Sequence, residues 1–370
     1  MRLLTDLESS GCASESCERR RSLQRKGTPI AGISDWDFIR PRIGAQSFSR
    51  FKSLPFCDPA VAAHILDAVG ESFMRIAVTT PTGHIGNKLA NLLLDRKADV
   101  TLIARHPEKV KDLTSRGAKV IAGEHSDAAV VEQAVKAADA LFWLTPSDIT
   151  SHDPLGLARR MAEAGASVIR KHPDLRVVQL SSAGAFLPSG TGPIVGLHDT
   201  EEKFRAAGKN IVALRPNEFM ENVFMSLPTI IAQGSIYTSI PGSVKAEYIA
   251  TQDIAEIAAE FLLNPIDGHH VIDIVGPQQL SLNEWASIAG EAIQKQVRVV
   301  TVPGDALKAA MSQAGLSSEM AALLVEMEEA FPKILGQFHG EQKRVGKVTF
   351  AQFAREVFAP GYKQALQSAA

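Results

Sequence analysis

The chain has 370 residues, of which 45% are hydrophobic and 22% are charged, a composition typical of a globular protein with one large domain or a domain plus a smaller lobe. Its formal net charge of −2 provides no basic excess for nucleic acid or an anionic membrane surface. No apolar run approaches the ~18 residues of a transmembrane helix. We therefore expect neither a nucleic-acid partner nor a membrane partner.

The first 73 residues differ from the rest of the chain. The basic run at 19–26 has no sustained period, and nearby acids argue against a transit peptide. Because Met74 directly precedes the first predicted strand, we expect residues 1–73 to be a disordered or non-native N-terminal extension. All three cysteines lie in this stretch, which leaves no thiol elsewhere for a disulfide, for thiol catalysis or for a cysteine-rich zinc site. We expect a cytoplasmic protein without a metal site.

Residues 76–86, IAVTTPTGHIG, combine a buried strand, a turn of small residues and the start of a helix. In this order the backbone N–H groups and the positive helix end can hold a dinucleotide pyrophosphate, with Gly83 allowing close approach and Gly86 close helix–strand packing. Thr80 stands where the full glycine pattern has its first glycine. The pattern predicts a phosphate site, rather than a plain tight turn, formed by Thr80, Pro81, Thr82, Gly83, His84, Ile85 and Gly86.

From residue 74 onward, short apolar strands alternate with helices. The predicted strands are 74–79, 99–104, 118–122, 139–144, 175–181 and 210–215, and the helices between them are 84–95, 107–116, 126–137, 152–171 and 199–207. Strands that alternate with helices pair in parallel, and helices cover both faces of the sheet. The sequence predicts an α/β fold with a doubly wound parallel sheet, the Rossmann fold.

After residue 216 the alternation becomes less regular. The predicted helices are 217–232, 251–263, 281–293, 303–314 and 316–330, with short strands near 270–274 and 297–302. We expect an NAD(P)-binding domain at 74–216, followed at 217–370 by a smaller, mostly helical lobe that carries the substrate site or a lid.

The residues after the second and fourth strands bear on the choice of cofactor. Arg105 follows the second strand, where a fold selective for NAD normally has an acid for the ribose 2′-hydroxyl. A guanidinium can instead pair with a 2′-phosphate, and Lys109 adds a second positive charge. This predicts NADP(H) as the preferred cofactor and NAD(H) as a possible one, unless Arg105 is merely solvated. Thr145 and Pro146 border the same crevice, near the nicotinamide ribose or in a plain turn.

The usual catalytic pair of dehydrogenases with this architecture, Tyr-x-x-x-Lys, is absent. The three tyrosines are Tyr237, Tyr248 and Tyr362, and the residues four positions later are Pro241, Gln252 and Leu366. The chain has instead HDTEEK at 198–203, where His198 is a candidate pocket wall or proton donor and Lys203 a candidate ribose contact. The alternative is a polar helix start capped by Asp199 or Thr200.

Seven segments together resemble the NmrA-like group of atypical short-chain dehydrogenases over residues 74 to about 358: TTPTGHIG, ARHPEKV, LFWLTP, HDTEEK, LRPNEFMENVF, YIATQDIAEIAAEFLLNP and GPQQLSLNEWASIA. The resemblance implies that LRPNEFMEN closes over the nicotinamide, which gives Asn217, Glu218 and Phe219 contacts with the cofactor. It also implies that Asp253 caps the helix that follows it. We expect the substrate pocket to be bounded by Ser182, His198, Phe219 and Asn222.

Three functions are compatible with these residues. The first is an NADPH-dependent reductase of quinone-like or azo-like acceptors, in which direct hydride transfer needs no Tyr-Lys pair. The second is a non-catalytic NAD(P) redox sensor or transcriptional co-regulator of the NmrA type, and the third an isoflavone-reductase-like enzyme with Lys203 as the acid–base. The expected partner is accordingly a small-molecule acceptor or a regulatory protein, and the chain is a monomer or homodimer.

Overall fold

The computed structural model describes residues 73–369, so the expectation for the N-terminal extension lies, except for Phe73, outside the described residues. Its centre is an eight-stranded sheet in the order β12-β9-β6-β5-β4-β1-β2-β3. Every neighbouring pair is parallel, which confirms the predicted fold class. The strands are β1 (Arg75–Thr79), β2 (Asp99–Ala104), β3 (Lys119–Ala122), β4 (Ala140–Leu144), β5 (Arg176–Leu180), β6 (Asn210–Pro216), β9 (His269–Val275) and β12 (Gln342–Val345).

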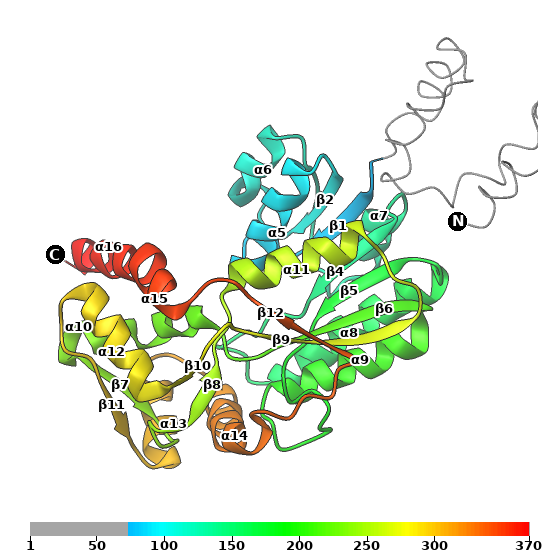
Figure 1. Cartoon of the computed structure of the whole chain (residues 1–370). Helices are drawn as coiled ribbons and strands as arrows, with labels where there is room; N and C mark the ends of the chain where they lie inside the picture. The colour runs from blue at the N-terminus through cyan, green and yellow to red at the C-terminus, as the bar shows by residue number, and fades with distance from the viewer. Residues whose placement is uncertain (1–72, 370) are drawn as a thin grey trace, which may run out of the picture. The chain divides into compact units, whose positions relative to one another are not determined.

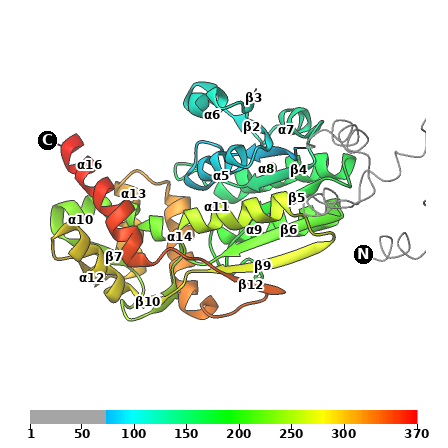
Figure 2. The ribbon, with the colours of Figure 1, turned by 45° about the horizontal axis from the view of Figure 1, so that its top comes forward.

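Helices cover both faces of this sheet (Figures 1 and 2). One face packs against α5 (His84–Asp95) and α11 (Thr251–Leu263), and the other against α7 (Ala128–Val135), α8 (Pro154–Lys171) and α9 (Ile194–Ala207). Successive strand residues alternate between the two layers, so Ile76 and Val78 contact the first set whereas Ala77 contacts the second. The short η2 (Pro107–Val110) and α6 (Lys111–Ser115) connect β2 to β3.

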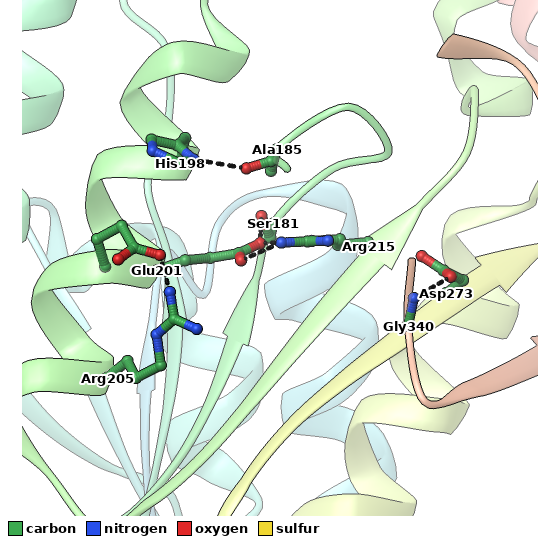
Figure 3. A network of polar contacts seen from close by, with 9 residues as sticks. Ser181, Ala185, His198, Glu201, Arg205, Arg215, Asp273 and Gly340 are labelled. Atoms are coloured by element: carbon green, nitrogen blue, oxygen red, sulfur yellow. Dashed lines mark hydrogen bonds and ion pairs between the residues drawn. The ribbon is translucent and has the colours of Figure 1, made fainter. Parts of the chain in front are cut away.

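Two strands from beyond residue 216 extend the main sheet. We expected the strand near 270–274 to belong to the C-terminal lobe, and this placement is wrong because β9 pairs with β6 along its whole length. The second half of β9 is continuously buried, as in a parallel strand covered on both faces. Asp273 of β9 then accepts a hydrogen bond from the Gly340 amide at 2.6 Å, which fixes the approach to β12 (Figure 3).

The C-terminal lobe has a separate aromatic core, in which Trp285 stacks on Phe350 with ring centroids 4.7 Å apart. The final helices, beyond residue 350, were not expected from the sequence. The elements of the lobe are η3 (Met220–Ser226), α10 (Leu227–Gln233), β7 (Ser235–Thr238), β8 (Lys245–Glu247), β10 (Gln279–Ser281), α12 (Leu282–Ile293), β11 (Arg298–Thr301), α13 (Gly304–Gln313), α14 (Ser318–Ile334), α15 (Phe350–Phe353), η4 (Ala354–Phe358) and α16 (Ala359–Ala369).

Two kinds of feature are absent from residues 73–369. None of their helices has both the length and the hydropathy needed to cross a membrane. They also bring together no group of three or more histidine, cysteine, aspartate or glutamate side chains arranged to hold a metal ion.

Phe204 is the side chain on which we expect the α8–α9 layer to depend most. It is fully buried, and its ring meets Trp143 edge-on with centroids 5.2 Å apart. Phe204→Ala should lower the free energy of unfolding by about 3–5 kcal/mol, as measured by urea denaturation. The matched change Phe73→Ala, at a residue 42% exposed, should alter it by less than about 0.5 kcal/mol. Equal losses would show that Phe204 does not anchor this layer.

Candidate functional site

The candidate site lies where the strand order reverses. β1 stands between β2, the next strand in sequence, and β4, so the connections leave in opposite directions on its two sides. In open α/β sheets, ligands bind at this switch point, outside the carboxyl ends of the strands. The segments that follow β1, β2, β4, β5 and β6 all start from this edge, and they contain the residues singled out from the sequence.

The turn from β1 into α5 has a geometry that depends on its glycines. A Cβ on Gly86 would lie 2.2 Å from the Thr80 carbonyl oxygen, so only glycine allows the helix this close to the strand. At Gly83 the corresponding contact is an ordinary 3.5 Å. Thr80, which replaces the first glycine of the pattern, has φ of +51°, a conformation that β-branched residues rarely adopt. The backbone therefore keeps the glycine-type turn despite the threonine.

The same turn presents unpaired polar groups. The hydroxyl of Thr80 is buried and has no hydrogen-bond partner among the described residues. The N-terminus of α5 has no side-chain cap and no acid in its first turn. The first N–H groups of a helix lack partners inside the helix, and its dipole makes this end positive. A buried hydroxyl beside such an uncapped end fits a phosphate group of a dinucleotide.

Side-chain hydrogen bonds fix the ends of β1 and β4 beside this turn. The Thr79 hydroxyl accepts from the Leu144 amide at 2.9 Å, and the Trp143 indole N–H donates to the Thr145 hydroxyl at 3.0 Å. Thr145 and the neighbouring Pro146 are thus held at the end of β4, next to the turn.

The two candidate 2′-phosphate residues lie in solvent. The Arg105 side chain is 70% exposed after β2, and its guanidinium stands 3.8 Å from a Glu124 carboxylate oxygen. Lys109 is exposed within η2. Both cations are available at the rim of the crevice, but Arg105 already faces one carboxylate that offsets part of its charge.

His125 is a buried residue to which the sequence analysis assigned no role. Burial lowers its pKa to about 4, and the nearby Arg105 contributes, so the imidazole is neutral at physiological pH. Its ring meets Trp143 edge-on at 5.1 Å, and its Nε2 has no partner among residues 73–369. The burial of His125 could not be predicted from the neighbouring residues, because it comes from Trp143 of β4.

His198 lies inside α9 rather than at its beginning. The helix starts at Ile194, five residues earlier than expected, so the proposed capping by Asp199 or Thr200 is wrong. The Thr200 hydroxyl instead donates to the Gly196 carbonyl within the helix. The His198 Nδ1 lies 2.8 Å from the Ala185 carbonyl oxygen (Figure 3) and must donate to it, because a carbonyl only accepts.

Lys203 is held by two carboxylates. Its ammonium lies 2.8 Å from Asp199 and 3.2 Å from Glu163 of α8. The hydrogen bond that Lys203 donates to Asp199 is the main cause of the raised pKa of Lys203. These two ion pairs hold the Lys203 ammonium at the interface between α8 and α9. Its role as a ribose contact or as an acid–base remains a prediction.

A buried network of polar contacts joins β5, α9 and β6 (Figure 3). The Arg215 guanidinium donates to both oxygens of Glu201, at 2.9 and 2.6 Å, and the Ser181 hydroxyl also donates to Glu201. All three residues are less than 9% exposed. The adjacent Ser182 is half-buried, and its hydroxyl donates a hydrogen bond to the Ala183 carbonyl.

The segment after β6 crosses from the main sheet to the C-terminal lobe. The Asn217 amide donates to the Ile274 carbonyl, and the Glu218 carbonyl accepts from the Ile249 amide. Phe219 and Ile249 form a parallel bridge. The Asn222 side-chain amide donates to the Glu218 carboxylate. These contacts hold Glu218, Phe219 and Asn222 at the same edge as the turn after β1.

Asp253 does not cap α11. Its carboxylate accepts from the Val348 amide at 3.0 Å and so holds the chain that enters the final helices. The start of α11 is capped by Glu221, which accepts from the Thr251 amide at 3.0 Å and pairs with Lys88 of α5 at 3.2 Å. The expectation failed because a glutamate 30 residues away in the sequence provides the cap.

Several known proteins of similar sequence or structure are reductases. The chain is 26% identical over 284 residues to the NAD(P)H azoreductase of Xenophilus azovorans, covering 76% of this chain and 96% of that protein. An NADPH-dependent quinone oxidoreductase from Escherichia coli superimposes with a TM-score of 0.60 at 20% identity, over 76% of this chain and 99% of that one. The triphenylmethane reductase of Citrobacter sp., solved with NADP(H), gives 0.59 at 20% identity, over 72% and 92%.

The family match covers the region that contains the turn after β1. Residues 81–265 match the model of the NAD(P)H-binding family, half of the 370-residue chain. The matched stretch runs from the turn through α11 and includes the segment after β6. This chain therefore belongs to the NAD(P)H-binding family, with the fold of the NmrA-like atypical short-chain dehydrogenases.

Proposed function

We propose that this protein is an NADPH-dependent reductase that transfers hydride directly to quinone-like or azo-like acceptors. The observation that carries the proposal is the turn between β1 and α5, where the buried Thr80 hydroxyl and an uncapped helix end fit a phosphate group. Family membership and the similarity to an azoreductase support the same reading.

Groups that follow four strands, β1, β2, β4 and β6, would hold the cofactor. The backbone of residues 80–86 would bind the pyrophosphate, and Arg105 with Lys109 would bind the 2′-phosphate. Thr145 and Pro146 would border the nicotinamide ribose, and residues 217–219 would cover the ring. When bound, the reduced nicotinamide supplies the hydride.

The acceptor would lie between Ser182, His198, Phe219 and Asn222. The first two belong to the β5–α9 side of the crevice, and the last two to the segment after β6. All but the solvent-facing Asn222 are half-buried, and Phe219 contributes an apolar ring. A planar conjugated acceptor fits such walls, and its reduction does not require a tyrosine–lysine pair.

Gly83→Asp should abolish NADP(H) binding, because it places a carboxylate beside the phosphates and such like-charge contacts cost several kcal/mol. The fold should survive, since φ at Gly83 is −81° and a Cβ there meets only an ordinary contact. Titration calorimetry provides the measurement, and Gly83→Asn, of similar shape but neutral, should retain most of the affinity. Unchanged affinity in Gly83→Asp would show that the phosphates bind elsewhere.

Arg105→Ala should weaken NADPH binding by about 1–3 kcal/mol, the range for a hydrogen bond to a charged group, and leave NADH binding nearly unchanged. Parallel titrations with the two nucleotides test this. Lys136→Ala, which removes an exposed cation at the end of α7, is the control and should affect neither nucleotide. Equal losses for both nucleotides in Arg105→Ala would mean that the guanidinium does not read the 2′-phosphate.

The purified full-length chain should oxidise NADPH in the presence of quinones or azo compounds and should not oxidise simple secondary alcohols with NADP. The alcohol reaction needs a phenol activated by a lysine, which this sequence lacks. His198→Ala should slow acceptor reduction only modestly, since the Nδ1 proton is engaged by Ala185. Efficient alcohol oxidation would contradict the assignment, whereas tight NADP(H) binding without any turnover would favour a sensor.

A further inference from the structure

Three carboxylates lie where the main sheet meets the C-terminal lobe, and their hydrogen-bond donors differ sharply. Glu221 accepts from the Thr251 amide and hydroxyl and pairs with Lys88. Glu328 of α14 accepts from three groups, the hydroxyls of Thr238 and Ser239 and the Ser239 amide, at 2.7 to 3.0 Å. Several donors stabilise the ionised form of a carboxylate. Glu221 and Glu328 thus each meet several donors.

Glu218 has the opposite environment. The only donor to its carboxylate among the described residues is the side-chain amide of Asn222, and no lysine or arginine pairs with it there. Burial, and to a smaller extent the negative charge of Glu328, raises the pKa of Glu218 to about 7, although the Asn222 hydrogen bond acts in the opposite direction. Where neighbouring carboxyls have environments this different, the poorly solvated one carries the proton.

The groups that face Glu218 come from three elements. Asn222 belongs to η3, Glu328 to α14, and Tyr248 to the chain between β8 and α11. Tyr248 is itself buried, and its pKa is raised by burial and by the charge of Glu218, so it stays a neutral phenol. The titratable neighbours of Glu218 in the described structure are therefore acids, and none of them can neutralise an ionised Glu218.

Glu218 is also fixed in place at the proposed acceptor site. It directly precedes Phe219, and its own carbonyl accepts from the Ile249 amide at 2.9 Å. The residue remains half-buried rather than enclosed. The competing proton donor, His198, uses its Nδ1 proton for the Ala185 carbonyl. A neutral carboxyl on a segment held by this backbone contact suits proton donation better than an imidazole with that commitment.

We propose that Glu218 is the catalytic acid that gives the bound acceptor the proton accompanying the hydride, an inference that rests on the proposed function. The O–H bond of the carboxyl breaks, and an O–H bond to a quinone or an N–H bond to an azo compound forms. The electron pair of the broken bond stays on the carboxylate, which takes a new proton from water. The two electrons that reduce the acceptor come from the hydride, and NADPH is oxidised.

Glu218→Gln preserves the shape of the side chain and removes the proton. With NADPH and a quinone, kcat should fall about 100-fold, the lower range for loss of general acid catalysis. In the unmodified chain kcat should decline as the pH rises through about 7, since Glu218 must be protonated; Glu218→Gln should lack this decline. NADP(H) affinity from calorimetry should change little, because glutamine keeps the shape of the side chain that would cover the nicotinamide.

Glu328→Gln tests whether Glu218 acts through its proton, because a merely structural role of Glu218 would leave the pH dependence of kcat unchanged. Removing this like charge lowers the pKa of Glu218, so the decline in kcat should move to lower pH. Glu326→Gln, an exposed change on the same helix, should leave the decline where it is.

Thermal stability without cofactor provides a readout independent of turnover. Because the pKa of Glu218 is raised in the folded chain, folding is favoured while Glu218 is protonated, and this advantage is lost as the pH rises through about 7. Between about pH 5 and pH 9 the Tm of the full chain should fall more than that of Glu218→Gln.

The outcomes separate the inference from the function on which it rests. If the unmodified chain reduces acceptors and Glu218→Gln does so equally well with the same pH profile, Glu218 is not the acid. If Glu218→Gln weakens NADP(H) binding while kcat is retained, Glu218 serves cofactor binding alone and the inference is wrong. If the unmodified chain reduces no acceptor at all, the proposed function fails and the inference fails with it.

Discussion

The ion pair between Arg215 and Glu201 is the interaction on which the acceptor side of the crevice depends. It joins β6 to α9, and the Ser181 hydroxyl adds the end of β5 to the same carboxylate. The elements that carry Ser182, His198 and the segment after Pro216 are thus fixed relative to one another by one buried group. Loss of either partner would leave an uncompensated charge in the interior, which typically costs about 3–5 kcal/mol. The pair is therefore a strict geometric constraint on the site.

The two sides of the crevice are built by different means. On the nucleotide side, the close approach of Gly86 to the Thr80 carbonyl sets the shape of the turn, and backbone groups provide the polarity. On the proposed acceptor side, side chains from distant segments provide it, and they differ in the number of hydrogen-bond donors that each one meets. Glu218, Glu221 and Glu328 are the same residue type at the same seam, but only Glu218 lacks a full set of donors. Residue identity alone does not distinguish them.

The contrast between these two sides also explains what the sequence could predict. The strand–turn–helix at 76–86 and the alternation that follows are local patterns, and the sheet has the predicted class. The partner of β9 could not be predicted, because a seven-residue strand does not specify which edge it joins. The start of α9 was missed because Pro193, which directly precedes the helix, sets it through local geometry. The role of Asp253 was missed because its partner Val348, and Glu221 that caps α11 instead, are far from it in the sequence. The buried state of His125 depends on Trp143, and the raised pKa of Glu218 depends on its burial, and no periodic pattern encodes either.

Lys88 shows that the protein cannot be divided into interchangeable modules. It belongs to the helix whose first turn we assign to the phosphate, and its ammonium contacts both Glu221 and Thr251, beyond residue 216. A chimaera that takes residues 74–216 from this chain and the remainder from a relative keeps this ion pair only where the relative has an acid at the position of Glu221. Lys88, Glu221 and Thr251 are therefore to be exchanged together as one set of contacts.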